Sequence, residues 1–241
     1  MQSNFYVGLS AQISLQRRLE TVANNVANAS TAGFRAEEVK FEQLLSRVSA
    51  DPVAYATSGQ THLSRKSGEL VRTDNMLDVA VQGEAWLAVQ TPTGTAYTRD
   101  GRMKMSDTGK LVSVNNQPML DVGGAPLRLD PNAGPPTVAR DGTISQQGRQ
   151  IGALGLFTID QRANLTRVEN GGVLPDRPAN PALDFGKVGL HQGYIERSNV
   201  NPVQEMTKLI MLQHAFEAVT AALKDSDTSL QDAIKTLGAT S

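Results

Sequence analysis

Proline is missing from both ends of this 241-residue chain, and its distribution limits where long helices can form. All eleven prolines lie between Pro52 and Pro202, and sixteen of the twenty-one glycines lie between Gly83 and Gly193. Proline removes a backbone donor and clashes with the preceding helical turn, so its absence permits helices at both ends. The sequence therefore predicts helical termini on either side of a middle region rich in turns.

The first of these helices, expected within residues 1–45, carries an apolar seam. Its positions recur at spacings of four, three and four, as in a short coiled coil, and they are Leu15, Leu19, Val22 and Val26. Asn24 and Asn28 are four residues apart and therefore share one face of the helix. Glycine tolerates the left-handed conformation that ends many helices, so we expect Gly33 to end this one and Phe34 to pack back on its last turn.

The stretch between this helix and the middle of the chain carries weaker signals. Phe41, Leu44 and Leu45 are expected to form one further short helical stretch. Residues 46–69 are dominated by small and polar side chains, and we expect a linker or an extended loop there. A disordered linker and a segment that becomes ordered only on assembly both fit this composition.

The pattern changes to an alternation of period two in the middle of the chain. Leu77, Val79 and Val81 alternate with Asp78 and other residues, which is typical of a half-buried strand. Similar short apolar segments follow, and turn dipeptides such as Asp-Gly and Asn-Asn separate them. We therefore expect a compact, mainly antiparallel β domain over residues 70–193. The predicted fold class is α+β, with long N- and C-terminal helices that form a coiled-coil-like axial domain around this centre.

The C-terminal region, residues 194–241, opens its helix with a recognisable cap. The side chain of Asn201 can accept from the first turn, and Pro202 suits the first helical position. Apolar residues then alternate spacings of three and four, and those expected at an interface are Leu209, Leu212, Phe216, Val219, Leu223 and Leu230. This helix is longer than the β domain it would cover, so part of its seam needs another partner. A long helix packed only on its own domain is the alternative.

Composition excludes several classes of function. The 23 basic and 24 acidic residues are evenly mixed, which argues against a nucleic-acid-binding face and against polybasic anchoring to lipid. The absence of cysteine excludes disulfides, thiolate metal sites and cysteine nucleophiles. No apolar run approaches the roughly 20 residues of a membrane helix, and no basic segment typical of a signal peptide opens the chain. We therefore expect a cytosolic protein, or one exported without a cleaved signal.

The search for a chemical site in the sequence is mostly negative. The three histidines, His62, His191 and His214, lie in different regions without a metal-binding spacing. Phosphate-binding loops and nucleophile elbows are also absent from the sequence. We predict no catalytic, cofactor or metal site and hence no enzyme. The rival interpretations are an enzyme or carbohydrate-binding β domain that uses a pair of turn aspartates, and an adhesin-like surface protein.

Three segments resemble a known family. Residues 23–35 read ANNVANASTAGFR and are similar to the N-terminal signature of flagellar rod, hook and hook-associated proteins, usually A-N-N-L-A-N-x-x-T-x-G-F-K. Residues 77–83, followed by 97–101, resemble the entry to the family's β domain. Residues 193–203, which include Asn199, resemble the entry to its C-terminal helix. The segments occur in the family's order and at matching positions, and the resemblance covers most of the chain.

The resemblance implies a structural subunit of the bacterial flagellar basal-body rod, which self-assembles into the shaft that transmits torque from motor to hook. Chain length and residues 84–87 favour a proximal rod protein, with the distal rod protein FlgG as the alternative. The implied partners are copies of the chain itself, the rod proteins FlgB, FlgC and FlgG, and the flagellar type III export apparatus. The implied location is the rod in the periplasmic space, reached without signal cleavage and without membrane insertion. Both apolar seams are then expected to line the inner tube of the assembly.

Overall fold

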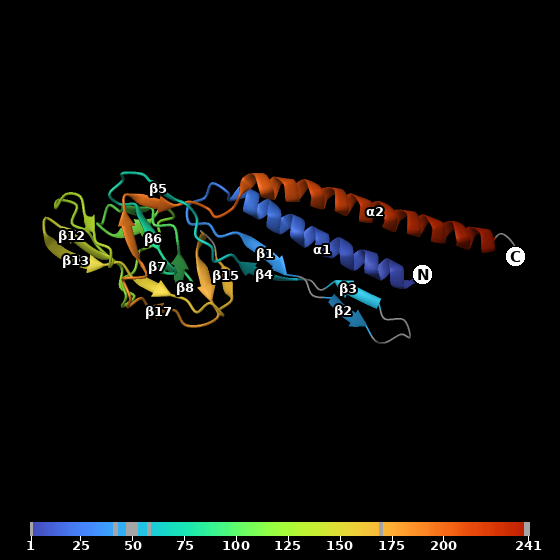
Figure 1. Ribbon diagram of the computed structural model, residues 1–241, viewed down its shortest axis with the longest axis horizontal. Helices are drawn as coiled ribbons and strands as arrows, with labels where there is room; N and C mark the ends of the chain where they lie inside the picture. Colours follow the sequence, from blue (N-terminus) through green and yellow to red (C-terminus); the bar gives the residue numbers. More distant parts are fainter. Residues whose placement is uncertain (1, 41–42, 47–52, 57–58, 169–170, 239–241) are drawn as a thin grey trace. The chain divides into compact units, whose positions relative to one another are not determined.

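The computed structural model describes residues 2–40, 43–46, 53–56, 59–168 and 171–238 (Figure 1). The chain forms two compact units and passes between them more than once. The first unit spans residues 1–27, 37–62 and 201–241, and the second spans residues 28–36 and 63–200. The first holds both long helices and the second holds most of the strands. The predicted α+β class is confirmed at this level.

The two helices of the first unit are α1 (Gln2–Ala27) and α2 (Pro202–Gly238), which run side by side in opposite directions (Figure 1). Gln12 of α1 donates from Nε2 to Oγ1 of Thr220 in α2 at 3.3 Å. A Cβ atom added to Gly8 would lie 2.5 Å from Cδ2 of Leu223, so glycine permits a close approach there. Position 8 thus lies beside position 223 and position 12 beside position 220, which fixes the antiparallel register.

Short strands complete the first unit. β1 (Glu37–Lys40) pairs with β4 (Gln60–Leu63), and β2 (Gln43–Ser46) pairs antiparallel with β3 (Val53–Ala56). The predicted helical stretch was wrong, because Leu44 and Leu45 lie in β2 opposite residues of β3. Phe41 lies outside the described residues. A stretch this short cannot repay the cost of helix nucleation, whereas cross-strand pairing needs few residues.

The region predicted to be a linker or extended loop also contains regular structure. β3 and β4 both fall within residues 46–69, and their partners lie at residues 43–46 and 37–40. Both strands are four residues long, β3 being apolar throughout and β4 mostly polar, so neither sequence shows a clear alternation. Each strand is stabilised by pairing with an earlier segment of the chain. Composition alone does not reveal such a partner.

The second unit contains a six-stranded sheet in the order β15-β16-β8-β7-β14-β17. Its strands are β7 (Trp86–Thr91), β8 (Gly94–Thr98), β14 (Leu156–Thr158), β15 (Leu165–Arg167), β16 (Val173–Pro175) and β17 (Asn180–Pro181). Its pairings are antiparallel, as predicted. The buried core of the unit includes the predicted strand residues Val79 and Val81, together with Leu87 and Val89 of β7, each at most 1% exposed.

Smaller antiparallel sheets surround this core. They are β6 (Val79–Gln82) with β18 (Gly189–Gln192), β5 (Leu70–Arg72) with β19 (Tyr194–Glu196), β9 (Met103–Met105) with β10 (Leu111–Ser113), and β11 (Thr137–Val138) with β12 (Thr143–Gln146) and β13 (Arg149–Ala153). Residues 194–196 therefore belong to the β structure, although the sequence placed them in the C-terminal helical region. Their pairing with a strand more than a hundred residues earlier leaves no local signal.

Candidate assembly surface

The predicted seams lie where the two helices pair. In α1, Val22 is buried and Leu15, Leu19 and Val26 are half-buried. In α2, the predicted interface positions whose side chains are described are all half-buried, and they are Leu209, Leu212, Phe216, Val219 and Leu223. Leu230 lies outside the described side chains. Helix pairing within one chain thus covers the α2 seam only in part, because none of these leucine, phenylalanine or valine side chains is fully buried.

The predicted helix start at Asn201 is confirmed. Oδ1 of Asn201 accepts from the backbone N–H groups of Val203 and Gln204 at 3.1 and 3.2 Å. Its carbonyl accepts from the N–H of Glu205 at 3.0 Å, and Pro202 is the first helical residue. These bonds satisfy donors that a helix leaves open at its first turn.

Asn25 connects three elements of the first unit. It is 2% exposed, its Nδ2 donates to the carbonyl of Glu37 at 2.8 Å and to Oε2 of Glu205 at 3.2 Å, and its Oδ1 accepts from N of Glu37 at 2.8 Å. It therefore holds α1, β1 and α2 together. The sequence analysis singled out Asn24 and Asn28 instead, although Asn25 follows the seam residue Val22 by three positions and therefore lies beside the seam.

Asn24 and Asn28 have separate partners. Asn24 lies near Glu37, with Nδ2 3.5 Å from Oε2. Asn28 belongs to the second unit, where its Oδ1 accepts from Oγ1 of Thr31 at 3.2 Å. The expected shared face of these two residues does not make one common site.

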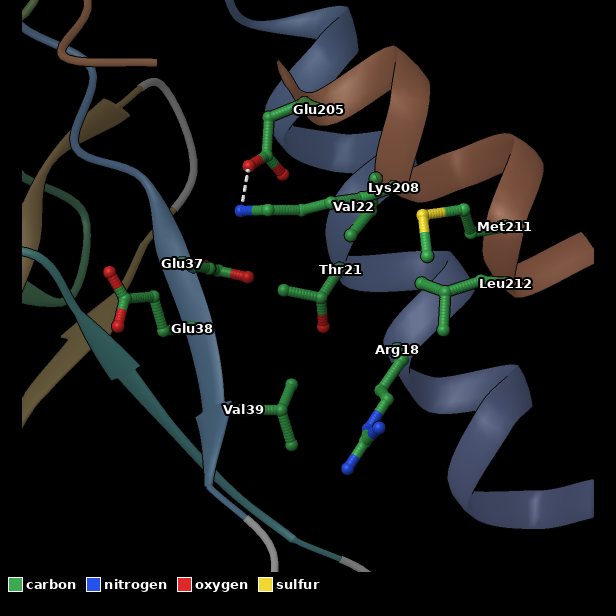
Figure 2. A pocket seen from close by; sticks show the side chains of 10 residues that line it. All are labelled: Arg18, Thr21, Val22, Glu37, Glu38, Val39, Glu205, Lys208, Met211 and Leu212. Carbon is green, nitrogen blue, oxygen red and sulfur yellow. Dashed lines mark hydrogen bonds and ion pairs between the residues drawn. The ribbon is translucent and has the colours of Figure 1, made fainter. Parts of the chain in front are cut away.

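A groove of about 480 Å³ lies between the helices and β1 (Figure 2). Its lining comes from all three elements and comprises Arg18, Thr21 and Val22 of α1, Glu37, Glu38 and Val39 of β1, and Glu205, Lys208, Met211 and Leu212 of α2. Figure 2 shows Val39 of β1 directed toward α1, where Arg18 and Thr21 lie, and Lys208 extended to its ion-pair partner Glu205. The groove thus combines apolar walls with charges of both signs, a composition suited to side chains of another protein segment.

Further apolar side chains of the helix pair are open to solvent, and the sequence analysis did not single them out. Each is at least 40% exposed, and they are Leu9 and Ile13 of α1 and Val203, Met206, Ile210 and Met211 of α2. We call these six the outer apolar residues. Val203, Met206 and Ile210 follow at spacings of three and four and therefore form a second helical stripe. Large apolar groups left exposed in this way mark interaction sites.

Residues 28–36, here called the signature segment, belong to the second unit and contact its strands rather than ending a helix. α1 ends at Ala27, so the prediction that Gly33 ends this helix was wrong. Gly33 has a φ of 68°, and its N–H donates to the carbonyl of Glu196 at 2.7 Å. A Cβ at this position would lie 2.3 Å from the backbone nitrogen of Asp100. The left-handed conformation of Gly33 is therefore used for close contact between two backbones.

The other predicted boundary residues serve the same docking. Phe34 is buried, with the guanidinium carbon of Arg167 4.1 Å from its ring centroid. Its packing on the last turn of α1 stays a prediction. Asn199 accepts from the N–H of Ala36 at 2.7 Å and donates to the carbonyl of Lys66 at 2.8 Å. These side chains connect residues 28–36 with other parts of the second unit.

A buried ionic cluster lies beneath this segment. Glu196 is 1% exposed, and its Oε1 and Oε2 lie 2.8 and 2.6 Å from Nη2 of Arg35 and Nη2 of Arg99. Arg99 also donates to the carbonyls of Val81, Gly83 and Ala85. Burial lowers the pKa of both arginines, to about 10 for Arg35, and the negative charge of Glu196 opposes that shift. The three residues of the cluster lie far apart in the sequence, so no local pattern predicted it.

Replacing Gly33 with alanine is expected to destabilise the second unit by roughly 2–5 kcal/mol, the sum of a left-handed backbone cost and overpacking. Gly124→Ala is the matched control, because Gly124 has a φ of 82° but open space where its Cβ would lie. The control should lose only about 1–2 kcal/mol. Urea unfolding, followed by fluorescence of the single tryptophan, Trp86, measures both. Equal losses would contradict the close-contact role of Gly33.

The histidines do not come together. His62 lies beside Glu38, His191 beside Gln82 and His214 beside Glu217. Among the described residues, no group of three or more His, Asp or Glu side chains could hold a metal ion. A search of the same residues finds no helix with the length and apolarity needed to cross a membrane.

Comparison with known proteins gives three successive matches to family models. Residues 5–35 match "Flagella basal body rod protein", residues 80–146 match "Flagellar hook protein FlgE/F/G D1 domain", and residues 191–236 match "Flagellar basal body rod FlgEFG protein C-terminal". The chain is 49% identical to the flagellar basal-body rod protein FlgF of Mesorhizobium japonicum over the full length of both. It is 47% identical to FlgF of Rhizobium meliloti over 99% of each chain. Identity to FlgG of Bacillus subtilis is 29%, over 97% of this chain and 98% of the relative.

Proposed function

The chain belongs to the FlgF family of flagellar basal-body rod proteins, and from this premise we propose how it acts as a structural subunit of the rod. The preference for FlgF over FlgG that residues 84–87 indicated is confirmed by the higher identity to FlgF chains. In our proposal α1 and α2 form the coiled-coil-like axial part of the subunit. Copies of the subunit pack through the helices into a proximal segment of the shaft that transmits torque.

The observation that carries this proposal is the incomplete coverage of the helix pair. The α2 seam is only half-buried, and the outer apolar residues are at least 40% exposed. Each large side chain buried on assembly contributes about 1.5–3 kcal/mol before the cost of ordering. Contacts between unlike surfaces of successive copies propagate into a helical array when they do not close a ring. Many such contacts in series make a stiff shaft.

The remaining parts of the proposal follow from family membership. The partners are copies of the chain, the rod proteins FlgB, FlgC and FlgG, and the flagellar type III export apparatus. The subunit crosses to the periplasmic space without cleavage of a signal and takes its place in the basal body there. Its work is mechanical, and it catalyses no reaction.

The seam can be tested by introducing charge on both helices. Leu19→Asp together with Leu223→Asp should prevent incorporation into basal bodies, because two charges would enter a partly buried apolar contact. The second unit should remain folded, as reported by Trp86 fluorescence. The measurement is the amount of the chain in isolated basal bodies, detected by immunoblot.

The matched control for this pair is Gln16→Asp together with Gln213→Asp, which place the same charges on exposed positions of the same helices. It should assemble normally. Normal incorporation of the Leu19/Leu223 variant would remove the seam from the proposal.

A further inference from the structure

Arg35 lacks part of its expected hydrogen bonding. Its side chain is 4% exposed, and Nη2 binds Glu196 at 2.8 Å. Its Nε and Nη1 atoms are buried and have no hydrogen-bond partner among the described residues. These two atoms carry three N–H donors of the guanidinium group. Buried donors of this kind are costly unless an acceptor meets them.

The charges around Arg35 do not balance. The cluster of Arg35, Arg99 and Glu196 holds two positive groups and one negative group, all nearly inaccessible to solvent. A buried net charge is strongly unfavourable without a counter-charge. Arg99 needs no further partner, because its donors reach Glu196 and three backbone carbonyls. Nε and Nη1 of Arg35 are therefore the donors of the cluster that need a further acceptor.

A cavity of about 20 Å³ lies at this position, lined by Arg35, Arg65, Gly83, Glu84, Trp86 and Arg99. This volume holds one particle of about the size of a water molecule. The donors of Arg65 already reach the carbonyls of Ile159, Asp160 and Ala163. The guanidinium carbon of Arg35 lies 6.0 Å from the ring centroid of Trp86.

The acidic groups near the cavity are engaged elsewhere. Glu84 is exposed, and its carboxylate accepts from Nε2 of Gln161 at 3.0 and 3.4 Å. The exposed carboxylate of Asp160, on the loop that Arg65 contacts, lies 3.6 Å from Nη1 of Arg177. With Glu196 already shared by two arginines, positive charge predominates at the cavity. A neutral water would satisfy a donor there but would leave that charge uncompensated.

We propose that this cavity is a binding site for one small monovalent anion of chloride size, held by the Nε and Nη1 atoms of Arg35. The three lining arginines select for negative charge, and the small volume excludes sulfate, phosphate and organic carboxylates. The bound anion would neutralise the cluster that fastens the signature segment to the β unit. Chloride should therefore raise the stability of the second unit by binding, beyond the screening that any salt provides.

Trp86 makes the site directly measurable, because it lines the cavity and is the only tryptophan of the chain. Bromide, a heavy-atom quencher of chloride-like size, should quench Trp86 fluorescence of the full-length protein along a saturable curve. Added chloride should displace it and restore the signal, whereas sulfate at equal ionic strength should not. Chloride should also raise the midpoint of urea unfolding to a plateau, and sulfate should give no plateau.

Arg35→Met is the decisive variant. It removes the unpaired donors but leaves Glu196 paired with Arg99, so the cluster becomes neutral and the β unit is expected to fold. Quenching by bromide should then become linear, and the chloride-specific rise in stability should vanish. Arg162→Met, at an exposed position of the same unit, is the control and should retain both effects.

Either of two results would overturn the proposal. One is linear bromide quenching of the unmodified protein with no difference between chloride and sulfate, which would assign the cavity to water. The other is saturable quenching that persists unchanged in Arg35→Met, which would place the anion elsewhere. Both readouts use the isolated protein, so failure of the site is distinguishable from failure of the rod assignment.

Discussion

Replacing Met206 and Ile210 together with aspartate is expected to abolish incorporation of the chain into the rod and to stop swimming. The two side chains are 52% and 54% exposed, so the isolated chain should lose little stability. In the assembly each position would forfeit about 1.5–3 kcal/mol of apolar burial and place a charge in a contact repeated at every copy. The loss of contact free energy is repeated at each subunit along the array, so incorporation should be almost completely abolished.

The control for this pair is Thr207→Asp together with Gln213→Asp, at exposed polar positions of the same helix. Swimming on soft agar and the chain content of purified basal bodies measure both variants. Circular dichroism of the isolated proteins should show equal helix content. If the Met206/Ile210 variant assembles as well as its control, this stripe does not contact another subunit.

Replacing Glu196 with glutamine is expected to destabilise the second unit by roughly 3–5 kcal/mol, the usual cost of removing one partner of a buried ion pair. The substitution keeps the shape of the side chain but leaves Arg35 and Arg99 buried without their counter-charge. The carboxylate also accepts from the N–H of Gly68 at 2.8 Å, so a connection to the chain before β5 weakens as well. Urea unfolding monitored by Trp86 fluorescence measures the change.

Glu69→Gln provides the comparison for Glu196→Gln. Glu69 is exposed and precedes β5, the strand that pairs with β19, so the same chemical change falls close by without burial. It should shift the free energy of unfolding by at most about 0.5 kcal/mol. Similar losses of unfolding free energy in both variants would show that the buried carboxylate of Glu196 stabilises the second unit no more than an exposed carboxylate does.

Local signals in the sequence located the helices and the larger strands well. The spacing of Leu15, Leu19 and Val22 predicted a seam on α1, and Asn201 and Pro202 fixed the start of α2. Alternation from Leu77 to Val81 predicted a strand that β6 confirms in part. These features depend on residues within one or two turns of each other, which a single sequence reveals directly.

Features that depend on distant partners could not be read in this way. Gly33 looked like a helix end, but its left-handed conformation serves a contact with the backbone at Asp100. Leu44 and Leu45 pair with Tyr55 and Ala54 of β3, so a short apolar run was mistaken for helix. The cluster at Glu196 joins residues 35, 99 and 196, and nothing near any one of them indicates the other two.

The outer apolar residues of the assembly surface were not predicted from the sequence. Val203, Met206 and Ile210 have helical spacing, so a second stripe was visible beside the seam through Leu209 and Leu212. A helix that must contact its own partner helix and neighbouring subunits needs apolar residues on more than one face, which the exposure of these side chains now supports.

The central claim is that neighbouring subunits cover the helix pair in the assembled rod, and thiol labelling tests it most directly. The chain has no cysteine, so the Ile210→Cys variant would carry a single thiol, at position 210. A maleimide reagent should modify it readily in the isolated protein and only weakly in purified basal bodies that contain the variant. Equal labelling in the two states would show that this face stays open to solvent after assembly and would contradict the account.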